Sequence, residues 1–194
     1  MVKINVNTNM GTAGLPGLQA IKTDLLVLTK LAGMELGPGP RAVDTALGGL
    51  LTQRMQERRF RGDCLEHILI DLQEEGYTDV PQRYILLVGL GSPARFCSHG
   101  TCKVFRLVLD KAVELGVDKV TIPFPPKRVT GPGLNLKGTA ALLKRVVVNR
   151  FGADGEQAGD GVIDTVEIVS TPQARRYIQS GLRSRAYQAD DCCD

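Results

Sequence analysis

The sequence predicts an α/β domain built on a mixed, mostly parallel sheet of about six strands covered by helices on both faces. Short apolar segments alternate along the chain with longer segments of helical periodicity, the order typical of such a sheet. Asp24–Leu28 and Tyr84–Val88 are almost entirely apolar, as expected of strands buried on both faces. The 194 residues, 43% of them hydrophobic and 23% charged, suffice for one core. We expect residues 1–182 to form a single domain and residues 183–194 a polar, frayed tail.

The first third of the chain contains two predicted strands and one long predicted helix. Lys3–Asn7 alternates apolar and polar residues, which favours a short strand. Gly11–Gly17 is a glycine-rich turn before the strand Asp24–Leu28, and the Gly and Pro residues of Gly33–Pro40 indicate a loop. A helix from about Ala42 to Arg58 follows, because six apolar residues recur there at helical spacing: Val43, Ala46, Leu47, Leu50, Leu51 and Met55.

The middle of the chain predicts two strands and a helix. The strands are His67–Leu72 and Tyr84–Val88; this pair and the short first strand are the places where antiparallel neighbours are allowed. The helix spans Ser98–Leu115 and ends at Gly116, which supplies a C-cap.

The last third predicts two more strands, two helices and the loops between them. In order, these are the strand Lys119–Phe124, the loop Arg128–Leu136, a helix from about Gly138 to Phe151, the polar loop Gly152–Gly161 and the strand Ile163–Val169. The final helix has Thr171 as its predicted N-cap, Pro172 at its first position and Gly181 after its last turn.

Composition excludes several classes of protein. No apolar run approaches the roughly 20 residues of a membrane span, and the first ten residues lack the apolar region of a secretory signal. Five Cys, an odd number, give no disulfide framework, so we expect a reducing cytoplasm. No Ser/His/Asp order, P-loop or metal-helix motif occurs, and only His67 and His99 could serve general acid–base chemistry. These absences leave an enzyme unsupported, and we expect no cofactor.

Two stretches resemble the N-terminal domain of the cytosolic leucine aminopeptidase family. Val43–Asp63 is similar to the family's helix with a small-residue pair followed by Phe and Gly, here Gly48–Gly49, Phe60 and Gly62. Arg83–Gly91 resembles the family's strand leading into a Gly-Leu-Gly turn, and a helix, Cys102–Leu115, follows at the expected distance. The resemblance covers roughly residues 23–151 and implies a three-layer α/β/α sandwich of the macro-domain-like type.

The resemblance also implies a function without catalysis. In that family the two metal ions of the peptidase site are held in a separate C-terminal domain, whose signature resembles Asn-Thr-Asp-Ala-Glu-Gly-Arg. Nothing similar occurs in these 194 residues. We therefore expect a non-catalytic binding or assembly module that contacts a partner protein or its own copies.

A small-ligand binder of the ADP-ribose or nucleotide type is the second hypothesis. Thr130–Gly138 is glycine-rich and precedes a helix, so its free amides and Lys137 could cradle an anion; the site residues would be Gly131, Gly133, Asn135, Lys137 and Gly138. The segment is similar in placement to the loop that holds the ADP-ribose diphosphate in ligand-binding macro domains. Those domains have an Asn-Ala-Ala-Asn-like stretch where this chain has Thr29–Gly33. An ordinary connecting loop is the alternative interpretation.

The turn Gly89–Ser92 (Gly89, Leu90, Gly91, Ser92) lies between a predicted strand and a predicted helix. Such turns often face a ligand at the carboxyl edge of a sheet, although tight backbone geometry explains the glycines equally well. If this turn and Thr130–Gly138 share one edge, they form a cleft.

Cys97, His99 and Cys102 form a cluster whose thiolates and imidazole suit zinc, with Cys64 or His67 as a further ligand. A reactive thiol at a helix start is another interpretation, and a cap at Ser98 or His99 with Cys102 in the core is the plainest. The adjacent Cys192 and Cys193 lie in the acidic tail, where we expect exposed thiols.

Basic residues gather in three places, which makes a nucleic-acid accessory domain the third hypothesis. The alternative is ordinary solvated helix faces. The three groups are Arg54, Arg58, Arg59 and Arg61; Lys144, Arg145 and Arg150; and Arg175, Arg176, Arg183 and Arg185.

Overall fold

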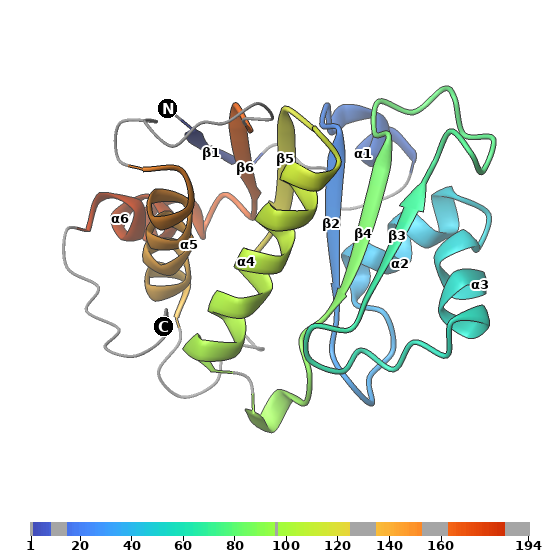
Figure 1. The fold of residues 1–194 in the computed structure, drawn as a ribbon, viewed down its shortest axis with the longest axis horizontal. Helices are drawn as coiled ribbons and strands as arrows, with labels where there is room; N and C mark the ends of the chain where they lie inside the picture. Colours follow the sequence, from blue (N-terminus) through green and yellow to red (C-terminus); the bar gives the residue numbers. More distant parts are fainter. Residues whose placement is uncertain (1, 9–14, 96, 125–134, 153–162, 185–194) are drawn as a thin grey trace.

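The computed structural model describes residues 2–8, 15–95, 97–124, 135–152 and 163–184 (Figure 1). Its strands are β1 (Lys3–Asn7), β2 (Leu25–Lys30), β3 (His67–Asp71), β4 (Tyr84–Gly89), β5 (Lys119–Pro123) and β6 (Thr165–Val169). Its helices are α1 (Leu15–Ala20), α2 (Pro38–Ala46), α3 (Leu50–Glu57), α4 (Ser98–Glu114), α5 (Leu136–Phe151) and α6 (Arg175–Arg183), with a short 3₁₀ turn at Pro93–Arg95.

The six strands form one sheet in the order β1-β6-β5-β2-β4-β3. All neighbours are parallel except β3, which runs antiparallel to β4 with Ile68 opposite Leu87. The predicted mixed, mostly parallel sheet of six strands is therefore confirmed. Its antiparallel member is the β3–β4 pair that the sequence allowed, whereas the short strand β1 pairs in parallel with β6.

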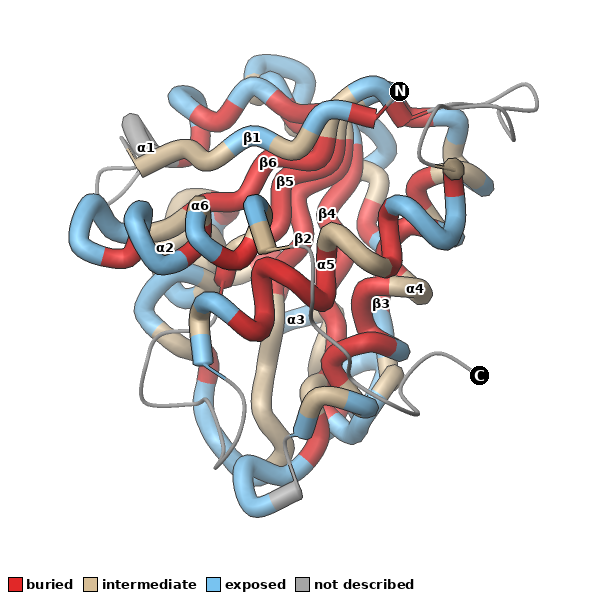
Figure 2. Tube along the Cα trace, turned by 90° about the vertical axis from the view of Figure 1, so that its left-hand side faces the viewer, coloured by how far each residue is buried: buried red, intermediate tan, exposed pale blue. Residues whose placement is uncertain are grey.

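Helices cover the sheet in two layers. Leu25 and Val27 of β2 face the core shared with α4, α5 and α6, while Leu26 and Leu28 face the core shared with α2 and α3. In Figure 1, α4 runs in front of the central strands, and α5 lies to its left, beside α6. Seen from the β1 side in Figure 2, the buried residues concentrate in the central strands, and α6 is largely exposed. The three-layer α/β/α arrangement follows from strands that are apolar on both faces.

The predicted helix from Ala42 to Arg58 is wrong in one respect, because it consists of two helices. Gly48 and Gly49 both have positive φ, 60° and 90°, and break the path between α2 and α3. The apolar residues keep their helical spacing across the break, so periodicity alone could not locate it. Helix α2 also begins at Pro38, inside the predicted loop Gly33–Pro40, because Pro suits a first helical turn.

Two other elements differ from expectation. Helix α1 (Leu15–Ala20) begins inside the predicted turn Gly11–Gly17. Helix α6 begins at Arg175 rather than at Pro172, and Gly181 lies buried within it instead of following its last turn. No helix in the described parts of the chain is long and apolar enough to cross a membrane.

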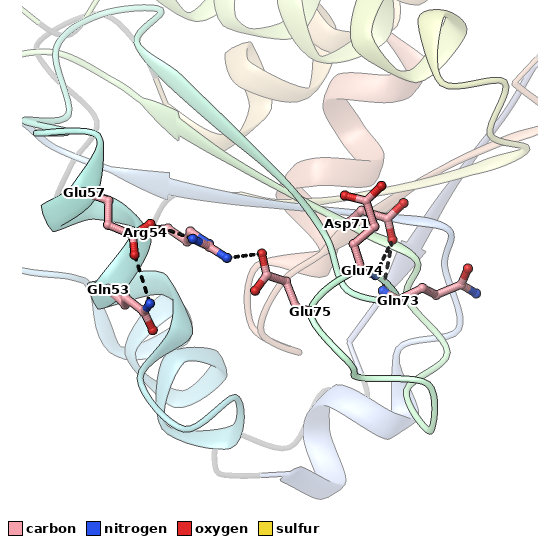
Figure 3. A network of polar contacts seen from close by, with 7 residues as sticks. All are labelled: Gln53, Arg54, Glu57, Asp71, Gln73, Glu74 and Glu75. Atoms are coloured by element: carbon pink, nitrogen blue, oxygen red, sulfur yellow. Dashed lines mark hydrogen bonds and ion pairs between the residues drawn. The ribbon is translucent and has the colours of Figure 1, made fainter.

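A polar network joins α3 to the segment after β3 (Figure 3). Arg54 forms ion pairs with Glu57, at 2.6 Å, and with Glu75. Hydrogen bonds from Gln53 and from Arg54 lower the pKa of Glu57, and the bonds to Glu75 and Glu57 raise the pKa of Arg54. At the same turn, the Asp71 carboxylate accepts a hydrogen bond of 2.9 Å from the Gln73 amide.

Candidate functional site

The central feature of the sheet is a crevice between the carboxyl ends of β2 and β4. These strands are parallel neighbours, but the chain leaves β2 toward α2 on one face and leaves β4 toward α4 on the other. The carboxyl ends of strands whose chains depart toward opposite faces are where ligands of open α/β sheets characteristically bind. A hollow of about 420 Å³ lies at this point. Its lining comes from Ala32 after β2, Leu90–Ser92 after β4, Gly100 of α4, and the pair Asp63–Cys64.

Three backbone amides of the turn Gly89–Ser92 are bonded to carbonyl groups of the chain. The Gly89 amide donates a hydrogen bond to the Glu66 carbonyl (2.7 Å). The Leu90 amide donates to the Lys30 carbonyl (2.8 Å), and the Gly91 amide donates to the Gly62 carbonyl (2.9 Å). A Cβ on Gly89 would lie 2.0 Å from the Asp63 carbonyl oxygen, so this glycine is required by close backbone approach. Leu90, Gly91 and Ser92 line the hollow, but the three bonded amides cannot cradle a phosphate.

The segment 61–66 contributes Asp63 and Cys64 to the lining of the hollow. One carboxylate oxygen of Glu66, Oε2, accepts hydrogen bonds from the amides of Arg61 (2.9 Å), Gly62 (2.8 Å) and Asp63 (3.0 Å). The Lys30 ammonium adds a bond of 3.0 Å to the Arg61 carbonyl. Asp63 and Cys64 of this segment line the hollow, and the Cys64 side chain lies beside Gly91 and Gly100. Sequence reasoning assigned no ligand role to Asp63 and treated Cys64 only as a further zinc ligand, because the contact with β4 is made across the sheet edge.

The chemistry of the hollow is that of an acceptor. Among the described residues that line it, Asp63 is the only carboxylate, Cys64 carries an exposed thiol, and none is Lys or Arg. Such a lining favours ligand groups that donate hydrogen bonds, such as hydroxyl and amino groups.

The second predicted loop is described only in part. Gly131 and Gly133 lie outside the described residues, while β5, which precedes them, ends at the same edge as β2 and β4. Asn135 is the N-cap of α5, and its Oδ1 accepts a hydrogen bond of 2.8 Å from the Gly138 amide. That amide is therefore occupied by the cap. Lys137 lines a different hollow, beside α6.

The cysteine and histidine cluster is spread between surface and core. Cys97 and His99 are exposed at the start of α4, whereas Cys102 is fully buried. The Thr101 hydroxyl donates to the Cys97 carbonyl at 2.9 Å, and the Cys97 side chain makes no capping bond. Within the described ranges, no group of three or more His, Cys, Asp or Glu side chains is arranged to hold a metal. Cys192 and Cys193 lie outside those ranges.

The three basic clusters differ in how their charges are balanced. Arg54 pairs with Glu57 and Glu75, and Arg150 pairs with Asp110 at 3.0 Å. Arg175, Arg176 and Arg183 form no ion pair with any described residue, and Arg185 lies outside the described part.

Comparison with known sequences relates part of the chain to an aminopeptidase. No protein-family model matches the chain. Over 94 residues it is 32% identical to a probable cytosol aminopeptidase of Cupriavidus taiwanensis; the match covers 48% of this chain and 17% of that protein. The chain thus spans about a sixth of the relative's length.

Solved structures show the same fold. A tomato leucine aminopeptidase mutant superposes with a TM-score of 0.63 at 18% identity, over 93% of this chain and 35% of that one. The macro domain of ganglioside induced differentiation associated protein 2 superposes with a TM-score of 0.65 at 14% identity, over 91% of this chain and 81% of that one. A Trypanosoma brucei macrodomain in complex with ADP superposes with a TM-score of 0.63 at 17% identity, over 92% of this chain and 67% of that one. The resemblance to the aminopeptidase N-terminal region and the macro-domain-like fold are both confirmed.

Proposed function

We propose that this chain is a non-catalytic binding module whose ligand is a nucleotide-type small molecule, with its nucleoside part in the crevice between β2 and β4. The observation that carries the proposal is the hollow of about 420 Å³ at the point where the chain leaves β2 and β4 toward opposite faces. Its volume lies in the range of small-molecule sites, about 300–1,000 Å³. The similar Trypanosoma brucei macrodomain was solved in complex with ADP.

The lining supports the nucleoside part of such a ligand. Ribose hydroxyls and an exocyclic amino group donate hydrogen bonds that the Asp63 carboxylate accepts. A diphosphate finds no cation among the described residues of this lining, and the amides of Gly89, Leu90 and Gly91 are already bonded. Recognition in the crevice therefore rests on hydroxyl and amino groups, while the phosphates extend out of it.

A protein partner is less well supported than a small molecule. The large apolar side chains exposed in the described ranges are Met34, Leu69, Val148 and Tyr177, which lie on four separate segments. Each is between 37% and 52% exposed. Isolated apolar side chains of this kind are normal on a monomer surface and provide no apolar interface core.

Calorimetric titration of the full chain with adenosine, ADP and ADP-ribose tests the proposal. We expect one binding site for all three compounds. Asp63→Asn should weaken the binding of each compound about tenfold, equivalent to about 1.4 kcal/mol for the charged hydrogen bond. Ser92→Trp, which fills the hollow from an exposed turn, should abolish binding. The matched control is Asp79→Asn, an exposed aspartate away from the hollow, which should bind as the unmodified chain does.

Two results would count against the proposal. The first is the absence of binding by all three compounds at millimolar concentration. The second is binding that survives Ser92→Trp, which would place the ligand elsewhere. Self-association seen in analytical ultracentrifugation, together with no ligand binding, would instead support an assembly module.

A further inference from the structure

A second hollow, of about 490 Å³, lies where α6 meets the start of α5. Among the described residues that line it, every side chain carries hydrogen-bond donors, three are cations and none is a carboxylate. The lining consists of Lys137 from α5 and Arg176, Gln179, Ser180, Arg183 and Ser184 from α6 and its C-cap. The hollow is therefore electropositive.

Gly181 is the residue that brings the two helices together. A Cβ at this position would lie 2.2 Å from the Lys137 carbonyl oxygen and 2.8 Å from the Ala140 Cβ. Helix α6 thus rests directly on the first turn of α5. Because no side chain separates the helices at this point, Arg176 and Arg183 of α6 share one hollow with Lys137.

The three cations are not balanced by acids of the described residues. Lys137, Arg176 and Arg183 form no ion pair there, whereas Arg54, Lys111 and Arg150 each do. Arg176 donates a hydrogen bond of 2.7 Å to the Tyr177 hydroxyl and lies 4.7 Å from the centre of its ring, which orients the guanidinium.

Two of the cations also stand where helix electrostatics disfavours them. Lys137 is the second residue of α5 and Arg176 the second of α6, and neither helix has an acid in its first turn. The positive end of a helix dipole opposes a cation in the first turn. Together with the mutual repulsion of the cations, this placement costs stability in the free chain, and a bound anion would offset that cost.

We propose that this hollow binds a small, multiply charged oxyanion, the phosphate or polyphosphate group of a soluble ligand. Guanidinium and ammonium groups together with hydroxyl donors are the groups that recognise phosphate oxygens. Three cations that line one hollow match a compact anion better than an extended one. The proposal is independent of the proposed function, because the hollow shares no residue with the crevice between β2 and β4.

Titration of the full chain with sodium tripolyphosphate at low ionic strength, followed by calorimetry and thermal unfolding, tests the site. We expect saturable one-to-one binding and a rise in melting temperature, both reduced by added salt. Lys137→Gln and Arg183→Gln should each weaken binding about tenfold. Lys103→Gln, an exposed lysine of α4, is the matched control and should bind normally, as should Asp63→Asn.

A second measurement separates loss of the site from loss of the fold. Without anion, Lys137→Gln should melt at the same temperature as the unmodified chain or at a higher one, because it removes an unfavourable cation. No binding by the unmodified chain, or equal weakening by Lys103→Gln, would overturn the proposal. So would a DNA duplex that binds through Lys137 and is not displaced by tripolyphosphate, since the hollow would then serve a nucleic-acid backbone.

Discussion

The Lys119 ammonium lies 3.1 Å from Oε1 of Glu167, across the neighbouring parallel strands β5 and β6. Glu167 is only 8% exposed, and its other oxygen, Oε2, lies 3.4 Å from the side-chain nitrogen Nδ2 of Asn7 and 3.5 Å from the Thr121 hydroxyl. One carboxylate therefore links the three strands β1, β6 and β5. The ion pair spans a diagonal of the sheet, since Thr121, not Lys119, is the register partner of Glu167.

Removal of this carboxylate should weaken the β1 side of the sheet. We expect Glu167→Ala to lower the free energy of unfolding by about 1–3 kcal/mol, the usual cost of leaving partly buried partners unsatisfied. Glu114→Ala is the matched control, because Glu114 forms an exposed i,i+3 pair with Lys111 at 2.7 Å. It should cost less than about 0.5 kcal/mol. Urea unfolding at pH 7 measures both, and equal effects would show that Glu167 is not a structural link.

The end of β4 should not tolerate a side chain. Gly89→Ala would place a Cβ 2.0 Å from the Asp63 carbonyl, so backbone must move. We expect a loss of about 3 kcal/mol, or roughly 6–12 °C in melting temperature. Gly76→Ala is an instructive contrast, because Gly76 has a φ of 84° but nothing within 4 Å of the added atom. Its expected cost is about 1–2 kcal/mol from backbone strain alone, and a thermal melt that ranks Gly76→Ala as the worse variant would contradict the close approach at Gly89.

The contact between α5 and α6 predicts a linked loss of stability and of anion binding. Gly181→Ala should push α6 away from the Lys137 carbonyl, with a cost of about 1–3 kcal/mol. It should also abolish the tripolyphosphate-induced rise in melting temperature. Gln173→Ala, at an exposed position just before α6 that does not line the hollow, should keep nearly the full rise. Retention of the rise in Gly181→Ala would mean that α6 does not build the anion site.

The network on α3 predicts a specific dependence of stability on pH. The pKa of Glu57 is lowered in the folded state, chiefly by the hydrogen bond from Gln53 and then by that from Arg54. A lowered folded pKa adds stability above the ordinary glutamate pKa of about 4.3, and that stability disappears as the pH falls through the folded value. Gln53→Ala should therefore be less stable than the unmodified chain at pH 7. The difference should shrink toward pH 3 in urea unfolding, and a constant difference would indicate that Gln53 acts through packing.

The central strands and their order of appearance could be predicted because their information is local. An apolar run such as Tyr84–Val88 is buried on both faces in the structure, as its composition requires. The break at Gly48–Gly49 was not located, since apolar spacing continues through it. Gly181 was predicted to follow the last turn of a helix. In the structure it lies within α6, where the lack of a side chain allows close contact with α5.

The two hollows depended on contacts between distant segments. Leu90, Gly91 and Ser92 were predicted to face a ligand and do line the crevice, yet Asp63 reaches them only because the segment 61–66 bonds to β4. Lys137 was grouped with the glycine-rich loop before it, while its cationic neighbours come from α6, about 40 residues later in the chain. Contacts between segments so far apart in the sequence cannot be predicted from a local sequence pattern.

The Glu66 carboxylate is an internal anion for the segment 61–66, which borders the crevice. The amides of Arg61, Gly62 and Asp63 converge on a single oxygen, as they would on a bound oxyanion, and the chain itself supplies that oxygen. The segment that presents Asp63 is consequently shaped before any ligand arrives. A ligand entering the crevice would not have to order this segment, so little conformational entropy would be lost on binding there.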